Sequence, residues 1–294
     1  MKPKVGILIV NGGGDPSAGR WLHICLKKIN SHTERSDYKI YLWNNNLGDT
    51  SVIEALKIYP GIQLINAAAG EKLKHQHASP LQKLYEIARY DKVQYIVTMD
   101  TDAFPVKTNW LPYLIRQLDD QTVLAGVWRD ELKKAIEPYI HPSCLCTTVD
   151  FVEKYRLRFD EVDISPEKKM DTLSCFTRTA LINNKKLFKL RRSNKEQFHY
   201  IMGGLYGDLI YHHGAGSRKY ILFWGEEKSA ALRLKNKTIN ESLQCMVFNY
   251  EQQYIDWLMG KLLGKSALES RCKELYAEIE KLERTLTEMD LNHA

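Results

Sequence analysis

The chain has 294 residues, of which 44% are hydrophobic and 27% charged, a composition typical of a globular protein with a substantial core. Lysine and arginine exceed aspartate and glutamate by 42 to 36, and the resulting net charge of +6 suits an anionic substrate but is too diffuse to indicate nucleic-acid binding. No stretch approaches the ~18 apolar residues that a membrane-spanning helix needs, so composition excludes both a disordered chain and a membrane-spanning one.

The cysteines and the N-terminus indicate where the protein works. Six cysteines form no C-x-x-C pair and no zinc spacing, which predicts reduced thiols. The apolar residues 5–10 give way at once to Asn-Gly-Gly-Gly, without the cleavage region of a signal peptide. We therefore expect a cytoplasmic protein.

The first residues predict the opening of a nucleotide-binding α/β unit. An apolar strand at 5–10 leads into a glycine-rich loop that starts with Asn11, and a helix follows from about residue 18 to 29. Glycine lets backbone amides approach a ligand closely. The loop matches neither the dinucleotide fingerprint nor the P-loop, so neither site is predicted.

Polar side chains recur where the next elements end or begin. Strands are expected at 38–43 and 62–65, and Asn45, just after the first of them, is a candidate ligand of a base or ribose; a simple asparagine turn is the alternative. His77 stands near the start of a helix that leads into the next strand, where it is a candidate contact for a phosphate, with an ordinary surface position as the alternative.

The stretch 92–106 organises the chain. Val93–Val97 predicts a strand buried on both faces, and the stretch ends in Asp100-Thr101-Asp102. In open α/β sheets ligands bind outside the carboxyl ends of the strands, which is where Asp100 and Asp102 would lie. Carboxylates two residues apart can share one divalent cation, so this motif predicts a metal-diphosphate site; a solvated turn is the alternative.

The second half supplies further candidates. After a helix at 110–118 and strands at 123–128 and 144–148, an acidic loop at 157–170 is followed by Asp171 at the start of a helix. Leu209–Tyr211 predicts a strand that ends in His212 and His213, whose imidazoles are the best remaining source of metal ligands.

The C-terminal part is predicted to be helical. An aromatic and apolar face at 248–263 either packs on the catalytic domain or makes peripheral contact with a membrane. Apolar residues then recur at steps of four and three between 266 and 289, a heptad seam that predicts a short coiled coil and a homo-oligomer. We expect two domains, at 1–240 and 241–294.

Taken together, these stretches resemble the GT-A fold glycosyltransferases, most closely glycosyltransferase family 2, over roughly residues 4–220. The resemblance rests on the order of five segments: ILIVNG, LWNNNLGD, VTMDTDAFPV, HPSCL and YHHGAGS. It implies a Rossmann-like α/β fold with a central mixed sheet flanked by helices, followed by a helical and coiled-coil extension.

The resemblance also implies roles for single residues. Asn11 and Asn45 would help to bind the nucleotide, Asp100 would contact ribose or sugar, and Asp102 would hold Mn²⁺ or Mg²⁺ with His212 or His213. The base of an inverting reaction matches Asp171, although it follows Met where the family often has Glu. The remaining candidates for the base are Asp160, Glu161 and Asp163.

The implied activity is sugar transfer from a nucleotide-diphosphate sugar to a hydroxyl of a glycan or lipid-linked saccharide, in the cytoplasm or at the inner face of the membrane. A sugar nucleotidyltransferase is the alternative among enzymes. A non-catalytic oligomeric scaffold is the alternative outside them.

Overall fold

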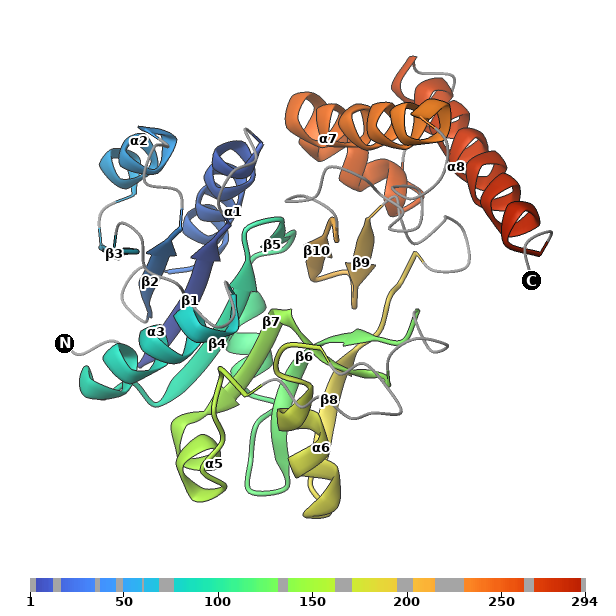
Figure 1. The fold of residues 1–294 in the computed structure, drawn as a ribbon. Helices are drawn as coiled ribbons and strands as arrows, with labels where there is room; N and C mark the ends of the chain where they lie inside the picture. The colour runs from blue at the N-terminus through green and yellow to red at the C-terminus, as the bar shows by residue number, and fades with distance from the viewer. Residues whose placement is uncertain are drawn as a thin grey trace. The chain divides into compact units, whose positions relative to one another are not determined.

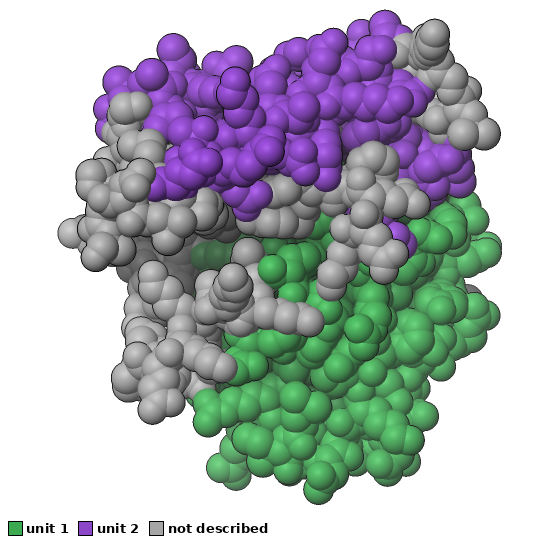
Figure 2. Space-filling model, turned by 90° about the vertical axis from the view of Figure 1, so that its right-hand side faces the viewer, with its two compact units in different colours: residues 1–192, 206–212 green, residues 193–205, 213–294 purple. Residues whose placement is uncertain are grey.

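The computed structural model describes residues 4–12, 17–34, 38–45, 50–59, 61–68, 77–131, 137–161, 171–194, 203–214, 230–261 and 267–291. The chain divides into two compact units, of which the first comprises residues 1–192 and 206–212 and the second residues 193–205 and 213–294 (Figure 2). Each unit is described by itself below.

The first unit is built on a seven-stranded sheet with the order β3-β2-β1-β4-β7-β6-β8 (Figure 1). All neighbouring strands are parallel except β7, which is antiparallel to both β4 and β6. The strands are β1 (Val5–Asn11), β2 (Tyr38–Asn44), β3 (Ile62–Asn66), β4 (Tyr95–Asp100), β6 (Thr122–Arg129), β7 (Tyr139–Thr148) and β8 (Lys186–Leu190).

Helices cover both faces of this sheet because its central strands are apolar on both sides. Along β1, Ile7 and Ile9 join one core and Leu8 and Val10 the other, as the alternation of side chains in a strand requires. The first core includes residues of α1 (Ala18–His32), α2 (Thr50–Ile58) and α4 (Trp110–Ile115). The second includes residues of α3 (Ala78–Tyr90), α5 (Val149–Lys154) and α6 (Ser174–Ile182).

Two local features direct side chains toward the edge where β4 ends. A small sheet, β5 (Ala103–Pro105), β10 (Ile210–His212) and β9 (Gly204–Tyr206), pairs His212 with Ala103. In β6 the register shifts between Gly126 and Trp128, and Gly126 has a φ of +156°. A Cβ at this position would lie 2.0 Å from the carbonyl oxygen of Cys144, so the irregularity requires glycine.

The second unit contains two long helices, α7 (Ala230–Leu258) and α8 (Ala267–Leu291), which pack against each other. Tyr250 has non-helical backbone angles and marks a kink in α7. None of the described helices is both long and apolar enough to cross a lipid bilayer.

The heptad seam lies on α8. Of its described members, Cys272, Leu275, Ile279 and Leu282 are buried within the single chain and Leu268 is partly exposed. The side chains of Leu286 and Met289 lie outside the described residues. Among the described positions, therefore, most of the seam is covered within the chain. Self-association through residues 266–289 stays a prediction from sequence.

The expected fold class is confirmed, since a central mixed sheet flanked by helices is followed by a helical extension. Several strands differ from expectation: β7 starts at Tyr139 and not at Cys144, and β5, β8 and β9 were not expected. The domain division expected at residue 240 stays a prediction.

Candidate active site

The candidate site lies at the edge of the main sheet where β4 ends. The carboxyl ends of the parallel strands meet at this edge, and β7 begins there because it runs in the opposite direction. Asp100 is the last residue of β4 and Arg129 the last of β6, and Arg129 pairs with Tyr139 at the start of β7. Residues far apart in the sequence are thereby brought to one place.

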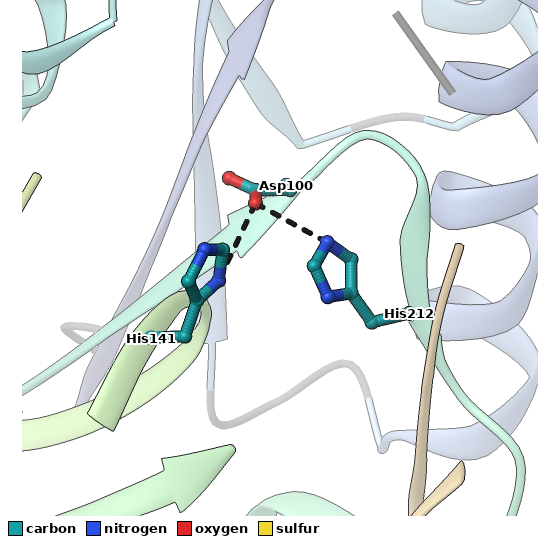
Figure 3. A group of neighbouring side chains, drawn as sticks. All are labelled: Asp100, His141 and His212. Atoms are coloured by element: carbon teal, nitrogen blue, oxygen red, sulfur yellow. Dashed lines mark ion pairs between the residues drawn. The ribbon is translucent and has the colours of Figure 1, made fainter. Parts of the chain in front are cut away.

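Asp100, His141 and His212 form a group that can hold a metal ion, with ligand atoms within 4.8 Å of one another. Asp100 Oδ2 lies 3.9 Å from His141 Nδ1 and 3.8 Å from His212 Nε2. Figure 3 shows the two imidazole rings on either side of the Asp100 carboxylate, with dashed lines for these ion pairs. Asp102 lies beside the group, with its Oδ1 3.7 Å from His212 Nε2.

Asp100 is held in its ionised form. Burial by itself would raise the pKa of Asp100, but the contact with His77 and the nearby His141 and His212 outweigh it, so the pKa lies well below the usual range. His77 Nε2 is 3.3 Å from Asp100 Oδ1. Burial would lower the pKa of His77, yet the hydrogen bond to Asp100 and the charges of nearby acids raise it.

The hydrogen bonds of the two central imidazoles define their tautomers. His141 Nδ1 accepts from the backbone N–H of Ser143 at 3.0 Å, and Nη1 of Arg129, which can only donate, lies 3.4 Å from His212 Nδ1. The hydrogen of each neutral ring therefore lies on Nε2, which faces carboxylates. Burial and the charge of Arg129 lower the pKa of His141 to about 4, so this ring is neutral near pH 7.

Asp171 lies on the other side of His141. Its Oδ2 accepts a hydrogen bond of 2.7 Å from the hydroxyl of Tyr139 and lies 4.0 Å from His141 Nε2. The turn that carries Asp171 into α6 includes Leu173 in the left-handed region, with φ of +63°. Such a conformation in a bulky residue costs on the order of 1–3 kcal/mol and is typical of functional sites.

The donor set fits a divalent cation. Three carboxylates, Asp100, Asp102 and Asp171, lie around two histidines that hydrogen bonds keep on the Nε2–H tautomer. A cation bound to His212 Nε2 would take the place of that ring's hydrogen and offset the negative charge of the carboxylates, whereas His141 could bind one through Nε2 only by giving up the hydrogen bond that its Nδ1 accepts from Ser143. His212 can then carry its ring hydrogen only on Nδ1, the atom that Arg129 contacts.

The predicted nucleotide ligands Asn11 and Asn45 lie at the ends of β1 and β2. Asn11 is fully buried, and its amide donates to Asn44 at 3.1 Å, while Asn44 donates to Asn66 at 3.3 Å. This ladder of amides links the ends of the three strands. Asn45 accepts from the indole N–H of Trp43 at 2.9 Å and is partly exposed. The nucleotide-binding roles of Asn11 and Asn45 stay predictions.

The structure separates the remaining candidates. Of the two neighbouring histidines it brings His212 to the group, while His213 is buried and its pKa falls to about 3 because of that burial. Asp160 pairs with Arg158 through two contacts of 2.8 Å, Glu161 is exposed, and Asp163 lies outside the described residues.

Sequence reasoning missed His141 and Arg129 as site residues. The signal for His141 was present in the segment HPSCL, which was interpreted only as a strand next to the metal site. It also expected Asp102 to hold the metal and Asp100 to contact ribose or sugar, whereas the metal-binding geometry includes Asp100. The role of Asp102 as a ligand stays a prediction.

No protein-family model matches the chain, and no curated protein sequence matches it. Solved structures of TarS from S. aureus are similar to it. TarS 1–349 in complex with UDP-GlcNAc has 10% sequence identity and a TM-score of 0.45 over 64% of this chain and 56% of its own. TarS 1–349 alone has 8% identity and a TM-score of 0.46 over 88% of this chain and 71% of its own.

A further TarS structure has 9% identity and a TM-score of 0.46, covering 90% of this chain and 44% of its own. This chain thus spans about half the length of two of the three TarS chains. The likeness is one of fold alone, and the function is argued below from the side chains of this chain.

Proposed function

We propose that this chain is a metal-dependent glycosyltransferase that moves a sugar from a nucleotide-diphosphate sugar to a hydroxyl acceptor. The observation that carries the proposal is the convergence of Asp100, His141 and His212 at the carboxyl edge of the sheet, with Asp171 4.0 Å from His141 on the far side. A metal-binding group next to a separately held carboxylate suits a reaction in which a diphosphate leaves while a hydroxyl loses its proton.

Each residue then has a distinct role. Asp100, His141 and His212 would hold the cation, with Asp102 beside them, and His77 keeps Asp100 oriented and ionised. When bound, a divalent cation supplies positive charge that stabilises the leaving diphosphate. Asp171 accepts the proton of the attacking hydroxyl as general base, and attack from the face opposite the diphosphate inverts the anomeric centre.

The ligand types favour Mn²⁺ over Mg²⁺. Mg²⁺ prefers oxygen ligands and loses water reluctantly, whereas imidazole nitrogen is an ordinary ligand of transition-metal ions. A group of one carboxylate and two imidazoles therefore suits Mn²⁺ better. The carboxylates of Asp102 and Asp171 do not change this preference, because carboxylate oxygen binds both ions.

The proposed donor is a nucleotide sugar, the class to which the UDP-GlcNAc bound to TarS belongs. The acceptor in this proposal is a glycan or a lipid-linked saccharide. All six cysteines are free thiols, which accords with the proposed cytoplasmic location at or near the inner face of the membrane.

The first experiment is a thermal-shift screen of the full chain against UDP, GDP, CMP and dTDP sugars, each with and without Mn²⁺. A ligand that binds only the folded protein raises its melting temperature. A rise with one nucleotide sugar only in the presence of Mn²⁺ therefore supports the metal site and identifies the class of donor. Asp100→Asn should abolish that shift. Asp160→Asn, which changes an acid paired with Arg158 and also an alternative base, is the matched control.

Product analysis separates this function from the alternatives. A glycosyltransferase releases a nucleoside diphosphate from the donor, whereas a sugar nucleotidyltransferase exchanges pyrophosphate with a nucleoside triphosphate. A scaffold turns over neither. Absence of both a metal-dependent shift and nucleoside diphosphate release for every donor would overturn the proposal.

A further inference from the structure

A network of charged groups lies behind His212, on residues that sequence reasoning did not select. Nε of Arg129 donates to Glu131 Oε2 at 3.0 Å. Glu131 Oε1 accepts from the hydroxyl of Tyr206 at 2.6 Å and lies 3.9 Å from Nη1 of Arg192. Only 4% of the Glu131 side chain and 1% of the Arg192 side chain are exposed, so the network is shielded from solvent.

The carboxylate of Glu131 lies between two guanidinium groups, those of Arg129 and Arg192. Burying an unbalanced charge is costly unless another group of opposite sign compensates it. Asp100 and Asp102 flank His212, the ring that Arg129 contacts, so the guanidinium of Arg129 lies next to the acidic groups of the candidate active site.

Arg129 has more donors than the described residues can accept. Its guanidinium carries five N–H groups, of which Nε is directed at Glu131 and one Nη1 hydrogen at His212. Among the residues that the structure describes, none accepts from Nη2. The Arg129 side chain is 17% exposed, more than the nearly inaccessible Arg192.

We propose that Arg129 is an anion-binding residue of this site, and that its Nη2 edge receives a phosphate oxygen of a diphosphate-bearing substrate. The inference rests on the proposed function and names the group that would bind the diphosphate besides the metal. Glu131 is the residue that positions Arg129, since its two oxygens are held by Arg129 and Tyr206. Arginine suits this task because its planar fork matches phosphate geometry.

The contact with His212 adds a second donor. When His212 uses Nε2 as a ligand, its ring hydrogen lies on Nδ1, which then no longer accepts from Nη1 of Arg129. Nη1 of Arg129 then loses this acceptor beside His212, and among the described residues neither terminal nitrogen has an acceptor. Two parallel N–H donors are the arrangement that binds phosphate in a bidentate manner.

The competing explanation is that Arg129 merely neutralises Glu131. That role requires the Nε contact and the charge, but it gives no use to Nη2 and places no ligand near the guanidinium. The two explanations differ in what happens to the binding of a small phosphate ligand, and inorganic pyrophosphate is a probe that needs no knowledge of the base or the sugar.

The test is isothermal titration of the full chain with pyrophosphate in the presence of Mn²⁺, and separately with Mn²⁺ alone. Arg129→Lys and Arg129→Gln should weaken pyrophosphate binding by about 10- to 100-fold, while the affinity for Mn²⁺ alone changes by less than about threefold. Arg89→Gln is the matched control, because Arg89 also pairs with a glutamate, Glu153 at 2.8 Å, on the surface.

Each outcome decides the inference. Equal pyrophosphate affinity in the wild type and both variants overturns it and leaves the proposed function standing. Equal losses for Mn²⁺ alone and for pyrophosphate mean that Arg129 acts through His212, which also overturns it. If the wild type binds neither pyrophosphate nor any nucleotide sugar with Mn²⁺, the proposed function itself fails. Arg129→Lys keeps the positive charge beside Glu131 but removes the planar pair of guanidinium donors. It therefore tests the role of these donors even if Arg129→Gln does not fold.

Discussion

The hydrogen bond between Tyr139 and Asp171 gives the sharpest test of the proposed base. Tyr139→Phe removes only the hydroxyl, which lies 2.7 Å from Asp171 Oδ2, and keeps the ring of a residue that is 3% exposed. If Asp171 is the base, Tyr139 is a positioning residue. It acts by fixing the carboxylate that would take the proton from the attacking acceptor hydroxyl, 4.0 Å from His141 Nε2.

The size of the effect follows from the exposure of the carboxylate. A hydrogen bond to a charged group contributes about 1.5–3 kcal/mol. The Asp171 side chain is 44% exposed, so water replaces part of the lost contact, and the lower end of that range applies. About 1.4 kcal/mol corresponds to a tenfold change in rate. We therefore expect kcat to fall about tenfold, with the KM for the donor unchanged.

The assay is release of nucleoside diphosphate from the donor that the thermal-shift screen selects, with water or a glycan as acceptor. Asp171→Asn should lower kcat by about 10²–10⁴-fold, as loss of a general base does. Tyr113→Phe, a partly exposed tyrosine on α4, is the matched control. A wild-type kcat in Tyr139→Phe would refute the positioning role, and a wild-type kcat in Asp171→Asn would refute the base.

Three further predictions concern stability and metal binding. Gly126→Ala should lower the free energy of unfolding by about 2–4 kcal/mol, because the added Cβ would lie 2.0 Å from the Cys144 carbonyl oxygen. Gly61→Ala is the control and should lower it less, because nothing lies close to its added Cβ. Urea unfolding measures both variants. Asp100→Asn should weaken Mn²⁺ binding by at least about 100-fold, and undiminished affinity by titration calorimetry would contradict the metal site. Burial would raise the pKa of Glu131, but the charge of Arg129 and the hydrogen bond from Tyr206 lower it, so Glu131 adds stability above its ordinary pKa of about 4.3 that is lost as the pH falls through the lowered value. Urea midpoints between about pH 3 and 6 should therefore fall less steeply in Glu131→Gln than in the wild type.

Local pattern was sufficient for the elements that organise the sheet. The continuous apolar run of β1 requires burial on both faces, and its alternate residues do enter two separate cores. The strand that ends at Asp100 was equally clear, because β-branched residues give way abruptly to acids and proline. In both strands the local order of apolar and polar residues determines where the strand lies and where it ends. The sequence alone therefore determined the α/β class and the position of Asp100 and Asp102.

The rest of the site depends on which strands pair, which no local pattern contains. His141 and Arg129 reach Asp100 only because β7 lies antiparallel between β4 and β6, so that its start meets their ends. His212 and His213 are indistinguishable by composition, but successive residues of a strand face opposite sides, and the pairing of His212 with Ala103 decides which one faces Asp100. The heptad pattern on α8 predicted an apolar stripe for a coiled coil, which stays a prediction, and the tertiary structure buries Cys272, Leu275, Ile279 and Leu282 of this stripe within one chain. An apolar stripe on a helix is stable only when it is removed from water. Whether another helix of the same chain or a second copy covers it depends on the packing of the whole chain.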